Sequence, residues 1–423
     1  MRSELTLEGG AGRARPSLRI RALRAQLLSR LAALRHGCLR IEDPYGSVEL
    51  GERGAALRAS VAIRDGAFYA AVAARGSVGA AEAHMDGLWS CDDLVALVRI
   101  LVLNRALLDR LEGGAARLAG WLLRAVHGLR RNTLAGSRRN IAAHYDLGNE
   151  FFKLFLSDDL MYSSALWDGP QDTLAQASQR KLARICARLE LGPGDHVLEI
   201  GGGWGGFALH AAAHHGCRVT TTTLSHEQQR LALERVQRAG LADRVTVLLE
   251  DYRSLRGRYD KLVSIEMVEA VGAEYLPIYF ARLGQLLSDS GLALVQAITI
   301  EDHRYAQALR SVDFIKRCIF PGSFIPSIHA LLSAKTEACE LSLVQLEDFG
   351  LSYARTLQAW REAFLARRSE VRALGFDERF IRMWEYYLAY CEGGFRERSI
   401  GVAQLLFAAP GYRPRPPGAV RGL

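Results

Sequence analysis

The feature that most constrains this chain is an apolar segment that runs directly into a glycine-rich turn at residues 196–206. It reads HVLEIGGGWGG and continues into a helix-like stretch that ends near residue 213. Glycine lets the backbone turn sharply and approach a ligand where a Cβ atom would clash. The N-terminus of the following helix adds unpaired N–H groups and the positive end of a dipole. The stretch therefore predicts a strand, a ligand-binding turn and a helix.

The chain after residue 174 alternates between helix-like and strand-like segments. We expect helices at residues 175–189 and 227–239, and strands at residues 196–200, 218–223, 244–249, 261–265 and 292–298. Repeated units of this kind specify a parallel, doubly wound sheet. The fold class predicted for this part is therefore α/β.

Two ligand classes fit the glycine pattern. Gly201, Gly203 and Gly206 satisfy the spacing of dinucleotide-binding turns, which is weak by itself. Glu199 also begins an acid-x-Gly-x-Gly-x-Gly pattern, which resembles motif I of class I (Rossmann-like) methyltransferases. A dinucleotide site needs an acid at the end of the next strand for the ribose hydroxyls, but residues 221–225 read TTTLS. We therefore favour S-adenosylmethionine, with a dinucleotide or a turn without ligand as alternatives.

The first third of the chain has a different pattern. Residues 1–16 read as a flexible tail, and residues 17–34 as a helix that carries apolar residues at helical spacing and arginines elsewhere. This helix either lies on a membrane surface or packs on its own domain. Short alternating runs at 47–50, 59–63 and 67–72, with a hairpin signal at Asp65-Gly66, precede helical patterns at 92–129 and a basic linker near 130–138. We predict a small N-terminal α+β domain at 17–130 and a catalytic domain at 131–423.

Composition narrows the class of protein. A chain of 423 residues with 49% hydrophobic side chains has room for two or three packed domains. No apolar run reaches the roughly 18–20 residues that span a bilayer. The seven cysteines form no CxxC pair, which favours a reducing, cytoplasmic location. The net charge of +8 (54 basic minus 46 acidic residues) favours anionic partners, but we find no nucleic-acid-binding motif and expect no nucleic acid.

Further motifs resemble the cyclopropane-fatty-acyl-phospholipid synthase family, which includes mycolic-acid-type fatty-acyl methyltransferases. They occur in order at residues 76–79, 85–89, 140–152, 161–164, 223–229, 249–253, 267–272, 319–322, 349–353 and 390–396. The resemblance covers nearly the whole chain beyond residue 50. It implies a peripheral enzyme at the inner face of the membrane, commonly a homodimer, whose N-terminal domain helps to bind phospholipid.

The resemblance also implies a reaction. A cis double bond of a phospholipid-bound acyl chain attacks the sulfonium methyl of S-adenosylmethionine, and the resulting carbocation loses a proton to close a cyclopropane ring. Such a site must exclude water and tolerate a developing cation, which aromatic faces can stabilise. The aromatic residues within the motifs, each of which can equally be core packing, are Tyr145, Phe151, Tyr162, Phe320, Phe349, Tyr353 and Phe395.

Carried over residue by residue, the resemblance implies two sets of site residues. The cofactor-binding set is Tyr145, Tyr162, Ser163, Glu199, Gly201, Gly203, Gly205, Thr223, Leu224, Ser225, Gln228, Asp251 and Tyr252. The catalytic set, which in the family surrounds a proton-accepting bicarbonate ion, is Ser164, Glu269, Gln296, Ile298 and Tyr353, with Cys391 nearby as a residue that shapes the site or reacts.

Four positions depart from the family pattern. Ser164 replaces a typical Cys, Gln296 a typical His, Ala270 a frequent His and Glu266 a frequent Gly. An amide cannot titrate, so Gln296 puts both ring closure and bicarbonate in question. Hydride shift or elimination would instead give a methyl-branched or methylene chain. The remaining alternatives are a methyltransferase for small molecules outside membranes, an RNA-binding methyltransferase and a lipid-binding protein without catalysis.

One further pattern contains residues that bind metals in other proteins. His210 and His214 are four residues apart in an expected helix, but they lack the glutamate of an HExxH motif and have no third ligand nearby in the sequence. We therefore expect no metal site.

Overall fold

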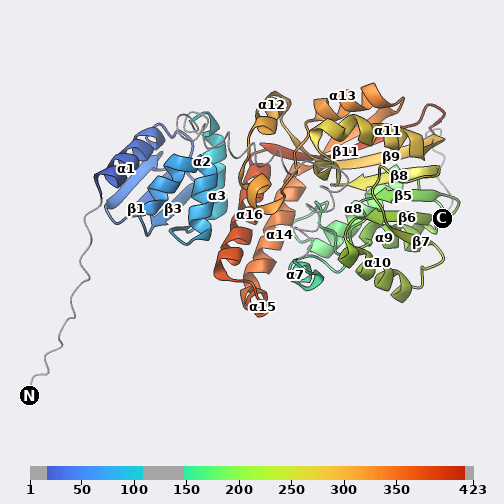
Figure 1. Cartoon of the computed structure of the whole chain (residues 1–423), viewed down its shortest axis with the longest axis horizontal. Coiled ribbons are helices and arrows are strands. Elements are labelled where there is room, and N and C mark those ends of the chain that lie inside the picture. Colours follow the sequence, from blue (N-terminus) through green and yellow to red (C-terminus); the bar gives the residue numbers. More distant parts are fainter. Residues whose placement is uncertain (1–16, 108–146, 415–423) are drawn as a thin grey trace, which may run out of the picture.

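The computed structural model describes residues 17–107 and 147–414. These residues form a small N-terminal unit, drawn in blue, and a larger unit that contains the C-terminal two thirds of the chain (Figure 1). No helix among the described residues is long and apolar enough to cross a membrane. Tyr145, the helical pattern beyond residue 107 and the predicted boundary near residue 130 lie outside the described residues.

The larger unit is built on a seven-stranded sheet. Its strands are β5 (His196–Ile200), β6 (Arg218–Thr223), β7 (Val245–Leu249), β8 (Tyr259–Ile265), β9 (Leu287–Ile300), β10 (Ser342–Asp348) and β11 (Ile400–Ala408). They lie in the order β10-β11-β9-β8-β5-β6-β7. The five strands from β9 to β7 are parallel, whereas β11 pairs antiparallel with β9 and β10 antiparallel with β11. The predicted parallel α/β sheet is confirmed, and the antiparallel edge is an addition to it.

Helices cover both faces of this sheet. One face packs on α8 (Leu174–Arg188), α9 (Gly206–His215) and α10 (His226–Arg238). The other packs on α11 (Leu276–Leu286) and α13 (Ile328–Ala338). Adjacent residues on a strand point to opposite faces, so Val197 joins the first core and Leu198 the second.

The N-terminal unit pairs a second sheet with three helices. Its elements are α1 (Leu18–Leu31), β1 (Cys38–Asp43), β2 (Gly46–Gly51), β3 (Arg58–Ile63), α2 (Ala67–Met85), β4 (Trp89–Cys91) and α3 (Leu94–Leu103). The strands lie in the order β2-β1-β3-β4. Leu23 and Leu27 of α1 are partly buried against the core of this unit, so the packed interpretation of this helix is confirmed.

One prediction in this unit was wrong. Asp65-Gly66 does not form a hairpin turn, and residues 67–72 are not a strand, because the chain enters α2 at Ala67. The alternation of apolar residues continues here into an alanine-rich sequence, and alanine has the highest helix propensity. The observed hairpin joins β1 to β2, where Asp43 pairs with Gly46.

The two units pack through a helical layer. The remaining described helices are α7 (Asn149–Lys153), α12 (Asp302–Arg310), a π-helix (Ile315–Ile319), α14 (Gly350–Ala366), α15 (Arg368–Ala373) and α16 (Glu378–Arg396). α16 lies against α14 on one side and α2 and α3 on the other (Figure 1). The Arg99 Nε atom binds Glu397 Oε1 across this boundary at 2.5 Å. A single hydrophobic core therefore includes residues of both units.

Candidate active site

The glycine turn has the geometry that the sequence predicts. Gly201, Gly203 and Gly205 have φ values of +86°, +53° and +81°, the left-handed region that favours glycine. At Gly202 an added Cβ would lie 1.8 Å from Thr221 Oγ1, so a side chain cannot fit there. At Gly203 it would meet only Gln228 Nε2, at 4.0 Å, and would occupy open space. The turn therefore leaves room for a ligand that contacts its backbone.

A small cavity of about 150 Å³ lies over this turn at the carboxyl ends of β5, β6 and β8. The predicted cofactor residues that line it are Tyr162, Ser163, Glu199, Gly201, Gly203, Thr223, Leu224, Gln228 and Tyr252. Glu250 also lines it, although the sequence did not single it out. Open α/β sheets bind ligands at this edge. The residues present fit S-adenosylmethionine, with glycines for close approach and polar side chains on the next strand.

Three predicted cofactor residues have other roles in the structure. Gly205 is the left-handed residue that precedes α9, and the Ser225 hydroxyl caps α10 by accepting from the Gln228 N–H at 3.3 Å. The Asp251 carboxylate accepts from Arg253 Nε and NH2, each at 2.8 Å. None of the three lines the small cavity.

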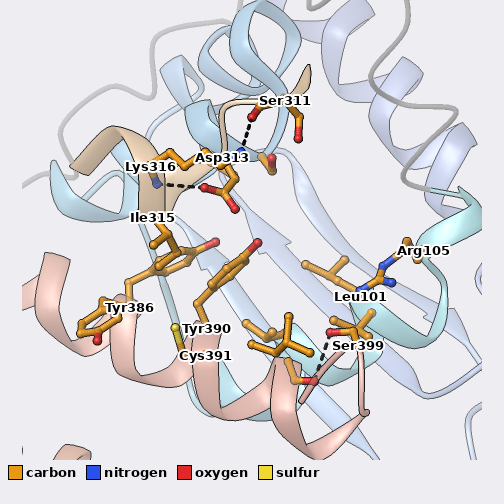
Figure 2. Close-up of a pocket in the computed structure, with 18 of the residues that line it drawn as sticks. Leu101, Arg105, Ser311, Asp313, Ile315, Lys316, Tyr386, Tyr390, Cys391 and Ser399 are labelled. Atoms are coloured by element: carbon orange, nitrogen blue, oxygen red, sulfur yellow. Dashed lines mark hydrogen bonds between the residues drawn. The ribbon is translucent and has the colours of Figure 1, made fainter. Parts of the chain in front are cut away.

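A second, larger cavity of about 990 Å³ opens between the two units. Its walls are mostly apolar and come from α1, β1, β3, α2 and α3 on one side and from α14, α16 and the π-helix on the other. Figure 2 shows part of it, where Leu101 and Arg105 of the N-terminal unit line the same space as Tyr390 and Cys391 of α16. Tyr162, Glu266 and Ala270 line both cavities, so the two meet at the end of β8.

Glu266 is the centre of this junction. Its Oε1 atom accepts from the Ser164 N–H and from Gln296 Nε2, each at 2.8 Å, and its Oε2 atom accepts from the Tyr353 hydroxyl at 2.8 Å. Glu266 also has a φ of +50°, an unusual backbone conformation for a side chain larger than glycine. Three of the five residues predicted around bicarbonate, Ser164, Gln296 and Tyr353, thus bind a carboxylate of the chain itself.

A relay of amides fixes how Gln296 faces Glu266. Gln404 on β11 donates through Nε2 to Gln296 Oε1 at 3.0 Å, because β11 and β9 pair these two residues directly. The Gln296 carbonyl is thereby satisfied, and its NH₂ group points to Glu266. With Ser164, Gln296 and Tyr353 all engaged, these donors do not fit a separate bicarbonate ion in this arrangement.

Glu269 is the second carboxylate of the junction. Its Oε1 atom accepts from the Ile298 N–H at 2.5 Å, and its buried Oε2 atom has no hydrogen-bond partner among the described residues. Burial, and then the charge of Glu266, raise the pKa of Glu269 to about 8. Burial raises the pKa of Glu266 as well, but hydrogen bonds from Gln296, Ser164 and Tyr353 oppose that rise. These bonds stabilise the carboxylate, so of the two coupled acids Glu266 carries the charge and Glu269 the proton.

The predicted aromatic residues separate into two groups. Tyr162, Phe320, Tyr353 and Phe395 line the large cavity, joined by Tyr386, Tyr387 and Tyr390. Phe151 is instead fully buried in the core, and Phe349 packs under Arg184 with the guanidinium carbon 5.2 Å from its ring centre. The first group therefore gives the large cavity an aromatic lining.

Cys391 shapes the cavity wall. Burial, with a further contribution from Asp313, raises the pKa of its thiol, and the nearby Arg396 binds Glu392 instead. A protonated thiol is a poor nucleophile.

Comparisons with known proteins agree with this geometry. The family model for mycolic acid cyclopropane synthetase matches residues 133–405. The chain is 41% identical over 340 residues to the tuberculostearic acid methyltransferase UfaA1 of Mycobacterium tuberculosis, a match that covers 78% of each chain. It is 36% identical over 353 residues to the cyclopropane-fatty-acyl-phospholipid synthase of Escherichia coli, covering 83% of this chain and 88% of that relative.

Solved structures give the same result. The cyclopropane synthase MmaA2 from Mycobacterium tuberculosis matches with a TM-score of 0.60 and 29% identity, over 64% of this chain and 98% of that chain. The mycolic acid cyclopropane synthase CmaA1, solved in complex with SAH and CTAB, also matches with a TM-score of 0.60. The family model covers more than half of the sequence, and the glycine turn, the sheet order and the motifs all agree with it. The chain therefore belongs to the mycolic acid cyclopropane synthetase family of S-adenosylmethionine-dependent methyltransferases.

Proposed function

We propose that this enzyme transfers a methyl group to a cis double bond of an unsaturated fatty-acyl chain carried by a membrane phospholipid, and that Glu266 accepts the proton that the product loses. The observation that carries the proposal is the junction of the small cavity over the glycine turn with a large apolar cavity, at a buried carboxylate. The names of the two curated relatives, which concern a fatty acid and a fatty-acyl phospholipid, support the substrate class.

Residues of the small cavity would hold the methyl donor. Gly201 and Gly203 would admit its amino-acid end, Thr223 and Gln228 its ribose, and Tyr252 its adenine. When bound, S-adenosylmethionine supplies an electrophilic methyl group on a sulfonium. The segment of Tyr162 and Ser163 closes the cavity towards the acyl chain.

The large cavity suits a long acyl chain. Its volume of about 990 Å³ lies at the upper end of the roughly 300–1,000 Å³ that is usual for small-molecule sites. Apolar walls exclude water, which would otherwise capture a carbocation. Tyr162, Phe320 and Tyr353 present aromatic rings where positive charge would develop.

The Glu266 carboxylate then provides the base. After methyl transfer, the neighbouring carbon of the former double bond carries the positive charge. A C–H bond of the transferred methyl group breaks, its proton goes to Glu266, and its electron pair forms a new carbon–carbon bond. If this happens at once, the new bond reaches the charged neighbouring carbon and the product is a cyclopropane. If a hydride first shifts to that carbon, the charge moves to the methyl-bearing carbon, the electron pair forms a double bond there, and the product is a methylene-branched chain.

We favour the methylene product. Positions 266, 270 and 296 all depart from the family pattern around the bicarbonate ion, so the part of the site that serves ring closure has changed. Three hydrogen bonds stabilise the Glu266 carboxylate and so weaken it as a base, which gives the hydride shift time to precede proton loss. One relative is named a methyltransferase and another a cyclopropane synthase, so the names leave the product open.

Vesicles of cis-unsaturated phospholipid, incubated with the enzyme and labelled S-adenosylmethionine, test the function. We expect labelled acyl chains whose NMR spectrum contains vinylidene protons. Upfield cyclopropane protons would overturn the product assignment, and no labelled lipid would overturn the function. Labelling of free small acceptors alone would favour an enzyme that acts outside membranes.

A pair of variants tests the base. Glu266→Gly leaves Ser164, Gln296 and Tyr353 without their acceptor and opens space for a small anion, so added bicarbonate should restore part of the lost activity. Glu266→Gln fills that space and should show no recovery. Equal recovery of both variants would contradict the assignment.

Association with membrane surfaces and a homodimer remain predictions, which vesicle flotation and light scattering check.

A further inference from the structure

The face of the sheet opposite α11 and α13 holds a cluster that the methyl-transfer site does not use. Cys186 of α8 and His210 and His215 of α9 bring one ligand atom each within 4.8 Å of one another. From the sequence we expected no metal here, because His210 and His214 have no third ligand nearby in the sequence. The packing of α8 beside α9 supplies that ligand from a different helix (Figure 1).

His210 is prepared as a ligand. Its Nδ1 atom lies 2.8 Å from Gln179 Oε1, which can only accept, so Nδ1 carries the proton. Nε2 therefore presents a lone pair, and this buried atom has no hydrogen-bond partner among the described residues. A hydrogen bond to the ring nitrogen that does not bind the metal orients metal-binding histidines. Burial, and then His214 and His215, lower the pKa of His210 to about 4, which keeps the ring neutral.

Cys186 provides the soft ligand. It is fully buried, and burial raises the pKa of its thiol to about 12, so without a metal it stays protonated. A bound cation replaces that proton, which leaves to the buffer, and the thiolate then compensates the charge of the cation. Thiolate and imidazole together select Zn²⁺ over Mg²⁺ or Ca²⁺, which prefer oxygen.

We propose that Cys186, His210 and His215 form a Zn²⁺ site, with water as the fourth ligand. Bonds of about 2.0–2.3 Å to a tetrahedral ion place ligand atoms about 3.3–3.6 Å apart. Ligand atoms now within 4.8 Å need movements of about 1 Å, which side-chain rotations provide.

The site would connect α8 to the last turn of α9. α9 begins at Gly206, directly after the glycine turn, so a cation at its other end restrains the helix whose N-terminus faces the cofactor cavity. Zinc would therefore raise the thermal stability of this face of the sheet without taking part in methyl transfer.

A tag-free full-length chain, stripped with a chelator, tests the site by Zn²⁺ titration against a chromophoric competitor. We expect one equivalent to bind and the midpoint of thermal unfolding to rise. Co²⁺ should give a thiolate-to-metal charge-transfer band in the near ultraviolet. Gln179→Leu removes the hydrogen bond to His210 Nδ1, together with an exposed one to Asp159, and should weaken binding by about 10–100-fold.

Matched controls distinguish this site from adventitious binding. Cys186→Ala should abolish the charge-transfer band and His210→Ala should weaken Zn²⁺ binding at least as much as Gln179→Leu. Cys217→Ala, another buried cysteine of the same core, and His214→Ala, the exposed neighbour, should retain both. Absence of binding by the native chain, or equal losses in the controls, would overturn the proposal. If Cys186→Ala fails to fold, the native Co²⁺ spectrum and the histidine variants still decide.

Discussion

The two cavities that meet at Glu266 are built in different ways. The small cavity is formed by one turn and the ends of neighbouring strands, and its lining includes four residues of positive φ: Leu160, Gly201, Gly203 and Glu266. The large cavity is formed by side chains from Leu23 in the first helix to Ile400 in the last strand. A sequence motif can predict the small cavity, because local backbone geometry forms it. No motif predicts the large cavity, because side chains that are distant in the sequence form it.

Substitutions at the junction should have the largest effect on activity, because the junction belongs to both cavities. We expect Glu266→Gln to lower lipid methylation by about 10²–10⁴-fold, the usual contribution of a general base. The amide keeps the shape of the side chain, so binding of S-adenosylmethionine should change little. Turnover with labelled donor and equilibrium binding measure the two effects, with Glu234→Gln on the exposed surface of α10 as control. Equal losses of turnover and of S-adenosylmethionine binding would mean that Glu266 contributes only to the structure of the small cavity.

Substitutions in the small cavity should have the second-largest effect, on cofactor affinity. Gly202→Ala places a Cβ 1.8 Å from Thr221 Oγ1, and overpacking of this kind costs about 1–3 kcal/mol. We expect cofactor affinity to fall by about 5–150-fold, since 1.4 kcal/mol corresponds to tenfold. Gly194→Ala is the control, because a Cβ there would meet nothing within 4 Å. Unchanged affinity in calorimetry would show that the turn does not hold the cofactor.

The carboxylate pair gives the third test, on stability. The folded pKa of Glu269 is about 8, above the ordinary value of 4.5, so between these values the folded chain binds the extra proton. Its contribution to the free energy of unfolding therefore falls as pH rises, by at most about 1.4 kcal/mol per pH unit, and is constant above pH 8. Glu269→Gln should remove this slope. Urea unfolding at several pH values between 5 and 9 measures it, and equal slopes for both proteins would contradict the raised pKa.

The large cavity should show the smallest effect. Leu27→Trp on α1 narrows the wall, and we expect the preference between long and short acyl chains to shift by about 3–10-fold towards the shorter, on the scale of a few methylene contacts. Cofactor affinity should not change. Leu18→Trp is the control, because Leu18 is 83% exposed on the same helix. Competition between phospholipids of different chain length measures the shift; an unchanged preference would place the acyl chain elsewhere.

The sequence predicts four of the five parallel strands to within two residues, whereas β9 (Leu287–Ile300) begins five residues before the predicted 292–298. β5 and β6 have the expected bounds, because each is a short apolar or β-branched run between clear turn or helix signals. The antiparallel strands β10 and β11 were not foreseen, since they follow a long helical region and carry no turn motif of their own. α2 was misread because a short alternating run fits a strand as well as a helix.

The sequence predicted several members of the candidate site, but it predicted neither Glu266 as a member nor the arrangement. Ser164, Gln296 and Tyr353 were expected around a bicarbonate ion, and the structure directs all three to Glu266. The only signal in the sequence was an acid in place of a frequent glycine at the end of β8. That departure could not show which donors it meets, because they come from a loop, a strand and a helix far apart in the chain.

The position of α1, β1 and β3 in the wall of the large cavity has an evolutionary consequence. Every residue proposed to hold the methyl donor or to accept the proton belongs to the C-terminal unit, whereas much of the wall of the large cavity, the proposed acyl-chain site, belongs to the N-terminal unit. On this proposal, substitutions in the first hundred residues alter which acyl chains fit, while the residues proposed for the chemical step stay the same.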